Sequence, residues 1–222
     1  MSKRPLTLIA ALVLAAGLTA CGGEDETAAD SAPVDNANSV PCTYTEEGGA
    51  AKEADLPPDM SAYDGDVPVT ITTSAGEVSA TLDASAAPCT VNSFVSLAEQ
   101  GYFDDTICHR LTTQGIFVLQ CGDPSGTGGG GPGYSFPDEV TGDEKYGPAT
   151  IAMANAGPDT NGSQFFLVYG DSSVLQPDYT VFGEMDPEGL KVVEEVGAAG
   201  TADGGPDGAP ATEIGISAVT VD

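Results

Sequence analysis

The residue best suited to chemistry is Arg110, in the run Cys-His-Arg-Leu-Thr-Thr-Gln-Gly-Ile-Phe-Val-Leu-Gln. Its guanidinium stays charged at any physiological pH and offers five N–H donors in a fixed fork. If residues 1–20 are removed as an export segment, Arg110 is the only arginine left. Four cations then face 34 acidic residues, for a net charge of −30. This placement favours a functional donor, and a salt bridge to one of the many carboxylates is the simpler alternative.

Two neighbours of Arg110 could do other chemistry. His109 is a candidate acid or base, and Cys108 beside it is a candidate thiol nucleophile. Residues 126–133, Gly-Thr-Gly-Gly-Gly-Gly-Pro-Gly, superficially resemble a loop that cradles phosphate. They lack the Gly-Lys-Ser/Thr ending of such loops and lie in an acidic protein, so we interpret them as a permissive loop.

Four of the five cysteines, Cys42, Cys89, Cys108 and Cys121, follow the export segment at wide spacings. An even set in an exported protein predicts two disulfides, with three possible pairings between which the sequence does not choose. Buried free thiols are the alternative. The spacing matches no zinc pattern, and His109 alone cannot complete a tetrahedral set of ligands, so no metal is expected.

The first residues carry the pattern of an export signal. Lys3 and Arg4 precede an apolar run over residues 6–18, which is too short to span a bilayer as a helix. The run leads into Leu-Thr-Ala-Cys, which resembles a bacterial lipobox ending at Cys21, and an ordinary secretory signal is the alternative. We therefore predict a signal peptide over 1–20 and a protein held at the outer face of the cell membrane by acyl chains on Cys21, palmitate among them.

Composition divides the rest of the chain. Residues 21–66 are rich in Ala, Gly, Glu, Asp, Asn and Pro and poor in large apolar side chains, which predicts a tether with little buried surface. A disulfide from Cys42 would pin this tether to the domain. Residues 67–222 fit one domain with a single core. The acidity argues against a nucleic-acid partner, because phosphates would be repelled.

The domain combines short strands with two helices. Apolar residues at every second position predict a hairpin over 67–73 and 77–82, and a phase shift after Ile216 predicts a bulge in the last strand. Many short strands, two isolated helices and long loops favour a closed antiparallel barrel with helices at its ends. Further strands are expected over 105–111, 116–121, 149–154, 164–169 and 180–184, helices over 88–100 and 187–196, and a loop over 122–148.

Three segments, taken in order, carry a family pattern. The first is the His-Arg pair at 109–110, followed by the Phe, Gln and Gly-Asp of 117–123. The second is Met-Ala-Asn-Ala-Gly-Pro-Asp-Thr-Asn-Gly-Ser-Gln-Phe-Phe over 153–166, and the third is Val-Phe-Gly over 181–183. Together they resemble the cyclophilin family of peptidyl-prolyl cis–trans isomerases. The resemblance covers residues 67–222.

The resemblance implies a mainly β fold, a closed eight-stranded antiparallel barrel capped by two α-helices, with a groove on its outside as the active site. It also implies isomerisation of X–Pro bonds in proline-containing polypeptides by a monomer, which would assist the folding of exported proteins. Rotation about a peptide bond breaks no covalent bond, so no nucleophile, general base or cofactor is needed.

By the same resemblance, Arg110 is the catalytic guanidinium, and Gln120 and Asn155 hold the substrate backbone. The histidine beside the arginine points the other way in the family, which implies a structural role for His109. The glycine-rich loop flanks a secondary groove for residues that precede the proline. The substrate-binding residues carried over are Phe117, Val118, Phe166 and Leu175 around the proline ring, with Ala154, Ala156, Gln164 and Tyr179 beside them.

Several positions depart from the commonest eukaryotic pattern. Six residues rather than four separate Arg110 from Phe117, so the turn between them is longer. Val118 stands where many members have Met, Tyr179 where they have His, and Val174 where they have the tryptophan associated with cyclosporin binding. We therefore predict weak or no cyclosporin binding, with a titration giving a high-micromolar affinity or none.

Two classes of function follow. The leading one is an extracytoplasmic prolyl isomerase, and the alternative is a proline-peptide-binding chaperone or holdase with little or no turnover. The presence of Arg110 favours the enzyme, because a module that only binds peptide could lose the arginine.

Overall fold

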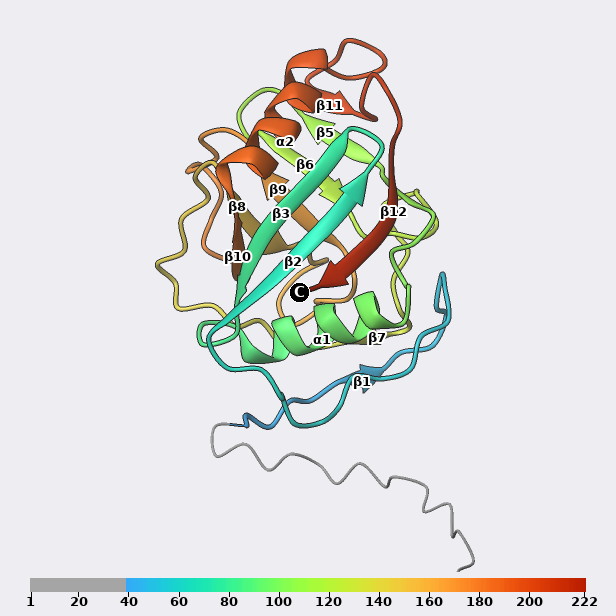
Figure 1. The fold of residues 1–222 in the computed structure, drawn as a ribbon, viewed down its shortest axis with the longest axis vertical. Coiled ribbons are helices and arrows are strands. Elements are labelled where there is room, and N and C mark those ends of the chain that lie inside the picture. The colour runs from blue at the N-terminus through green and yellow to red at the C-terminus, as the bar shows by residue number, and fades with distance from the viewer. Residues whose placement is uncertain (1–38) are drawn as a thin grey trace, which may run out of the picture. The chain divides into compact units, whose positions relative to one another are not determined.

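The computed structural model describes residues 39–222, so Cys21 and the predicted signal peptide lie outside the described residues. Two helices and twelve strands follow one another along this part of the chain (Figure 1). In order they are β1 Thr45–Glu46, β2 Asp66–Thr73, β3 Gly76–Asp83, α1 Pro88–Glu99, β4 Thr106–Cys108, β5 Arg110–Thr112, β6 Val118–Cys121, β7 Tyr134–Ser135, β8 Thr150–Met153, β9 Phe165–Val168, β10 Val181–Met185, α2 Pro187–Ala199, β11 Asp207–Gly208 and β12 Ile214–Val221.

The main sheet is antiparallel and curls into a barrel. Its strand order is β11-β5-β6-β9-β8-β10-β3-β2-β12-β4. The strand predicted over 105–111 is in fact two strands that break at His109, because β4 pairs with β12 whereas β5 pairs with β6 and β11. With β4 and β5 counted as halves of one broken strand and the two-residue edge strand β11 set aside, the curled sheet has eight strands. The predicted mainly β fold with two helices is confirmed.

The hairpin and the last strand follow the predicted pattern. Val69 and Ile71 of β2 point into the core, and β2 pairs with β3 from end to end. The register between β12 and β2 shifts between Ile216 and Ala218, where the sequence predicts a bulge. These matches show that the period-2 burial signal survives wherever one face of a strand is covered.

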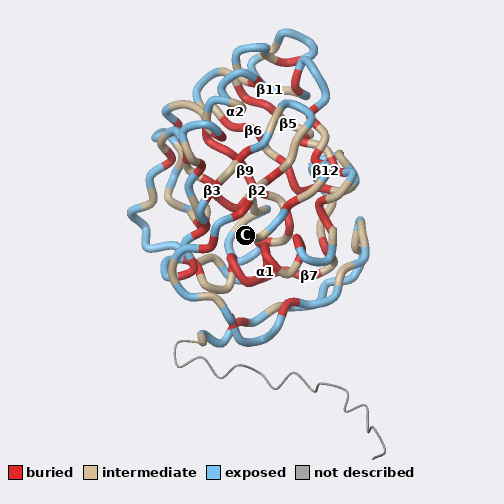
Figure 2. Tube along the Cα trace, viewed as in Figure 1, coloured by how far each residue is buried: buried red, intermediate tan, exposed pale blue. Residues whose placement is uncertain are grey.

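The two helices cover the barrel. Helix α1 begins with Pro88 at its first turn, and its Phe94 ring packs 5.0 Å from Phe103 and 5.4 Å from Phe165 between ring centroids. Helix α2 is capped by Asp186, whose carboxylate accepts a 2.6 Å hydrogen bond from the Gly189 amide. Figure 2 shows the buried stretches of the chain gathered inside the fold, with exposed loops around them.

Residues 39–66 lie against the domain, which corrects the prediction of a free tether for this part of the segment. The Tyr44 hydroxyl donates to the Cys89 carbonyl at 2.8 Å, and Lys52 Nζ donates to the Gly101 carbonyl at 2.8 Å. Strand β1 pairs with β7. The composition is poor in apolar side chains, so these polar contacts and a disulfide, rather than a core of its own, hold the segment in place.

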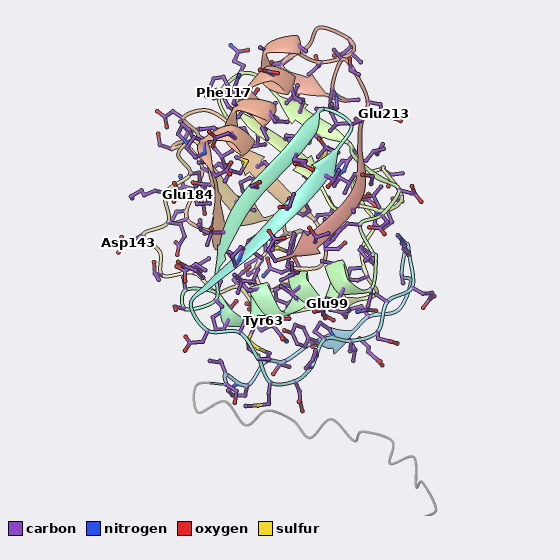
Figure 3. All side chains as sticks on the ribbon, in the orientation of Figure 1. Tyr63, Glu99, Phe117, Asp143, Glu184 and Glu213 are labelled. Atoms are coloured by element: carbon purple, nitrogen blue, oxygen red, sulfur yellow. A yellow bond between two sulfur atoms is a disulfide. The ribbon has the colours of Figure 1, made fainter. Side chains whose placement is uncertain are left out.

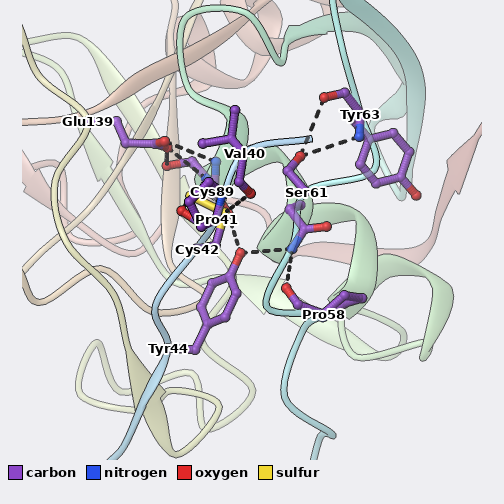
Figure 4. Close-up of a disulfide and its surroundings, with 11 residues drawn as sticks. Val40, Pro41, Cys42, Tyr44, Pro58, Ser61, Tyr63, Cys89 and Glu139 are labelled. Carbon is purple, nitrogen blue, oxygen red and sulfur yellow. Dashed lines mark hydrogen bonds between the residues drawn. A yellow bond between two sulfur atoms is a disulfide. The ribbon is translucent and has the colours of Figure 1, made fainter. Parts of the chain in front are cut away.

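Both predicted disulfides are present. Cys42 bonds Cys89 and so joins the N-terminal segment to the start of α1 (Figure 4), and Cys108 bonds Cys121 across β4 and β6. The alternative of buried free thiols is therefore wrong for these four cysteines. Within residues 39–222, no group of three or more metal-binding side chains converges, and no helix has the length and apolarity that crossing a membrane requires.

The acidic side chains of the described residues, apart from Asp123, lie at the surface. Glu99, Asp143, Glu184 and Glu213 are all exposed, and Figure 3 shows them on different sides of the fold. The separation of these four residues is the arrangement expected of a solvated acidic coat rather than of a single acidic patch.

We expect the bridge between Cys42 and Cys89 to stabilise the protein, because it closes a loop with a sequence separation of 47. Replacing both cysteines, as Cys42→Ser with Cys89→Ser, should lower the free energy of unfolding by about 2–4 kcal/mol. Urea unfolding under non-reducing conditions measures this change. An unchanged midpoint and slope would show that the bridge adds nothing to the stability of the domain.

Candidate active site

A small pocket of about 130 Å³ lies on the outer face of the barrel, against β6 and β9. Eight of the residues predicted for the site come together here, although they derive from five separate stretches of the chain. The lining residues are Arg110, Ile116, Val118, Gln120, Ala154, Asn155, Phe166, Leu175 and Tyr179.

The apolar floor of the pocket follows from strand alternation. Val118 and Phe166 face outward and form a small cluster separate from the main core, whereas their neighbours Leu119 and Phe165 face the barrel interior. The rings of Phe166 and Tyr179 lie 5.6 Å apart in an edge-to-face arrangement. A second, smaller apolar cluster is thus built on the outside of the sheet.

Tyr146 holds one wall of this pocket and was missed by the sequence reasoning. Its hydroxyl donates to the Tyr179 carbonyl and accepts from the Tyr179 amide, both at 3.0 Å. Burial raises the pKa of Tyr146 to about 12. The hydroxyl therefore stays protonated and keeps both hydrogen bonds across the physiological range.

Arg110 is held by a two-pronged ion pair with Asp207. Its Nε and Nη2 atoms donate to the two carboxylate oxygens at 2.8 and 2.7 Å. The pairing of β11 with β5, with Asp207 opposite Thr112, brings the carboxylate to this position. The hydrogen bonds to Asp207 raise the pKa of Arg110, and those from Arg110 lower the pKa of Asp207. The sequence poses a salt bridge and a functional role in the pocket as alternatives for Arg110. In the structure Arg110 both pairs with Asp207 and lines the pocket.

The remaining donor edge of Arg110 points to the pocket. Its Nη1 atom donates to Gln120 Oε1 at 3.2 Å, and Gln120 Nε2 donates to Gln164 Oε1 at 2.9 Å. Gln164 Nε2 in turn donates to the carbonyls of Gly128 and Gly130 at 3.0 and 2.9 Å. One chain of side-chain hydrogen bonds thus links the guanidinium to the glycine-rich loop.

The glycine-rich loop is shaped from below by Asp123, whose side chain is fully buried. Its carboxylate accepts from the amides of Ser125, Thr127, Gly128 and Gly130. Burial raises the pKa of Asp123, but a hydrogen bond from the Ser125 hydroxyl, together with these amide bonds, outweighs it and lowers the pKa. A side chain at Gly130 would overlap the carboxylate, so only glycine allows this approach. The loop is a fixed wall with no phosphate-binding lysine.

This wall encloses a neighbouring groove of about 370 Å³. The groove shares Gln120, Ala154 and Asn155 with the pocket, so the two hollows are continuous. Two more of the predicted residues, Ala156 and Gln164, line the groove rather than the pocket. An extended chain bound in the pocket can therefore run on into the groove.

Phe117 lies outside the pocket, which corrects the predicted placement of this side chain. Its ring packs against Tyr169, with centroids 5.9 Å apart, and over Gly170, where an added side chain would overlap it. Ile116 lines the pocket instead. The reason is strand alternation. Residues 116, 118 and 120 face the pocket from β6 and the extended residues before it, and residue 117 faces the other way. That alternation was the available signal for Ile116.

The longer turn leaves the rest of the site undisturbed. Arg110 and Gln120 stay directly opposite each other in the pairing of β5 with β6. The additional residues are accommodated in a turn closed by a bridge between Gln114 and Ile116. The insertion therefore changes which apolar side chain meets the pocket and keeps the polar pair.

His109 and Cys108 take no part in either hollow. Both ring nitrogens of His109 are buried without a hydrogen-bond partner among the described residues, and burial lowers its pKa. Cys108 is bonded to Cys121 and has no free thiol. Of the groups that line the pocket, Arg110 alone is charged. The arrangement fits an oriented donor beside an apolar hollow and does not fit nucleophilic or acid–base chemistry.

Comparison with known proteins agrees with this geometry. The family described as cyclophilin type peptidyl-prolyl cis-trans isomerase/CLD matches residues 68–221. The chain is 54% identical over 149 residues to the probable peptidyl-prolyl cis-trans isomerase B of Mycobacterium tuberculosis, covering 61% of this chain and 48% of that protein. It is 40% identical over 151 residues to the probable isomerase A of Mycobacterium leprae, covering 60% and 80%. This chain thus spans about half the length of the first of these relatives.

A solved structure is also similar, the cyclophilin type peptidyl-prolyl cis-trans isomerase of Cryptosporidium parvum. It has a TM-score of 0.63 and 31% identity, and the match covers 71% of this chain and 98% of that one. A second structure of that protein was determined in the presence of the dipeptide Ala-Pro. With the family pattern extending over residues 68–221, this chain belongs to the cyclophilin-type peptidyl-prolyl cis-trans isomerase family.

Proposed function

We propose that this protein catalyses cis–trans isomerisation of X–Pro peptide bonds in polypeptides. The observation that carries the proposal is the placement of Arg110, fixed by Asp207 with its Nη1 edge directed to Gln120 in the lining of the pocket. The pocket offers the proline ring an apolar floor of Phe166 and Val118, beside polar side chains.

The chemistry of the reaction matches this arrangement. Rotation about an X–Pro bond loses amide resonance, with a barrier of about 18–20 kcal/mol, and takes tens to hundreds of seconds without a catalyst. As the bond twists, the lone pair localises on the prolyl nitrogen. A permanent donor at that nitrogen stabilises the twisted state more than the planar one. Arg110 would supply this donor.

Asp207 would act as a positioning residue. A free arginine side chain has many rotamers, and holding it in one of them lowers the entropy that the reaction must otherwise overcome. The carboxylate takes up Nε and Nη2, so Nη1 is the edge left for Gln120 and the substrate. Gln120 and Asn155 would hold one half of the peptide while the other rotates.

Replacing the guanidinium should remove catalysis and keep the fold. We expect Arg110→Ala to lower kcat/KM for an X–Pro peptide by about 10²–10³-fold, as loss of one oriented transition-state donor does in other enzymes. NMR exchange measurements on the full chain give the rate, and circular dichroism verifies the fold. Equal exchange by the two proteins would refute the role of Arg110, and peptide binding without exchange by the wild type would favour a holdase.

Asp207→Asn should lower kcat about three- to tenfold with KM nearly unchanged, because an amide holds the fork through one acceptor and the orientation of Nη1 is lost. Glu213→Gln is the matched control, with the same change in charge in the same C-terminal segment, and Figure 3 shows Glu213 at the outer rim beside β12. An increase in kcat for Asp207→Asn would mean that the carboxylate competes with the substrate for the guanidinium.

We also propose that the protein is a lipoprotein at the outer face of the cell membrane, where it assists the folding of exported proteins. The proposal rests on the basic and apolar start of the sequence and the lipobox-like Leu-Thr-Ala-Cys at Cys21. The two disulfides support it, because such bonds persist in oxidising compartments outside the cytoplasm. A monomer with weak or no cyclosporin binding completes the proposal; Val174, at the position assigned to the tryptophan, is 68% exposed.

Lipidation can be tested at a single residue. In a bacterial host with lipoprotein processing, the wild type should incorporate labelled palmitate and sediment with membranes. Cys21→Ala should lose the label and leave the membrane fraction, because the variant has no residue on which the acyl chains can be attached. Cys89→Ala is a control that removes a different cysteine. A wild type without label, or a Cys21 variant that stays in the membrane fraction, would refute the anchor.

A further inference from the structure

Part of the groove beside the pocket is built from outside the matched family region. Glu47, Gly48 and Gly49 line this groove together with the glycine-rich loop, whereas the family pattern begins at residue 68. The N-terminal segment thus adds a wall that belongs to this chain's own sequence. Any selectivity that the wall confers is therefore separate from the chemistry at Arg110.

The wall is held firmly in place. The amides of Glu47 and Gly48 both donate to the Gly133 carbonyl, at 2.8 and 3.1 Å, and the amide of Ala51 donates to the Gly131 carbonyl at 2.9 Å. Pairing of β1 with β7 precedes these contacts, and the bridge from Cys42 to Cys89 fixes the start of the segment. The carbonyls used belong to the glycine-rich loop, so the segment and the loop form one continuous part of the lining.

Glu47 brings the only ionisable carboxylate to the lining of the groove within the described part of the chain. Its Oε1 atom accepts a 2.7 Å hydrogen bond from the Ser135 hydroxyl. No other described residue donates to this carboxylate, and no described cation pairs with it. The rest of the lining is glycine backbone and neutral side chains, so the negative charge is oriented and available to a ligand.

We propose that this groove selects a lysine or arginine side chain located two or three residues before the proline, with Glu47 as the specificity-determining residue. The inference rests on the proposed isomerase function and names its preferred substrates. A peptide seated in the pocket reaches the groove through the shared Gln120, Ala154 and Asn155. A long cationic side chain can then lie along the glycine backbone and place its charge at the Glu47 carboxylate.

Glu46 supplies a matched control. It is the last residue of β1, directly before Glu47, is also exposed, and lines a neighbouring hollow with Ala54 and Leu56 that Glu47 does not line. Glu46→Gln and Glu47→Gln change the net charge equally. General attraction of basic peptides to an acidic protein is therefore the same in both variants, and only a local contact separates them.

The experiment compares three peptides that differ only in having Lys, Gln or Glu two residues before the proline. A second set of three peptides carries the same change three residues before the proline. For the full-length wild type, kcat/KM should be about two- to fivefold higher with Lys than with Gln, as for an exposed ion pair, and lowest with Glu. Glu47→Gln should bring the Lys-to-Gln ratio close to one, with the loss in kcat/KM falling on the Lys peptide. Glu46→Gln should keep the ratio, and added salt should reduce it in the wild type.

The outcomes separate this inference from the proposed function. Equal ratios in the two variants, or a wild type that treats Lys and Gln alike at both positions, would overturn the role of Glu47 while isomerisation stands. If the wild type does not isomerise any of the peptides, fluorescence anisotropy with the same peptides decides the matter. A Lys preference in Kd that Glu47→Gln abolishes and Glu46→Gln retains would uphold the groove, and its absence would overturn it.

Discussion

An arginine in a chain with 34 acidic residues will be paired with a carboxylate, and the fold determines which one and through which atoms. Pairing of β11 with β5 brings Asp207 alongside, and its two oxygens take the Nε and Nη2 edge of Arg110. The Nη1 edge is left for Gln120, which the register of β5 and β6 places directly opposite. The ion pair with Asp207 thus fixes the orientation of the guanidinium, and the rest of the site is arranged around its Nη1 atom.

From that edge the polar order extends across both hollows. Gln120 donates a hydrogen bond to Gln164, and Gln164 donates to two carbonyls of the glycine-rich loop. Asp123 organises the opposite side of the loop by accepting its amides. Each amide side chain uses its carbonyl on one neighbour and its NH₂ on the next, which fixes the orientation of both groups. The pocket and the groove are therefore joined by one chain of side-chain hydrogen bonds.

Much of this arrangement could be predicted from sequence, and the exceptions have physical causes. Strand alternation and the two isolated helices indicated the barrel, and the resemblance to the cyclophilin family, carried most distinctly by residues 153–166, supplied eight of the pocket residues. The sequence prediction placed Phe117 in the pocket by matching residue types to the family. Because side chains alternate between the two faces of a strand, the longer turn brings Ile116 to the pocket face instead. Asp207 gave no signal, since one acid among 34 is distinguished only by the non-local pairing that carries it to Arg110.

The N-terminal segment shows the same limit in another form. Its composition is that of a spacer, and it has few apolar side chains with which to stabilise itself. What orders residues 39–66 is supplied by the domain, as carbonyls at Gly131 and Gly133, a hydroxyl at Ser135 and a disulfide to Cys89. A segment ordered in this way is free to vary in its exposed side chains without loss of the barrel. It is therefore a suitable place for a carboxylate such as that of Glu47, which can alter the groove and leave the guanidinium untouched.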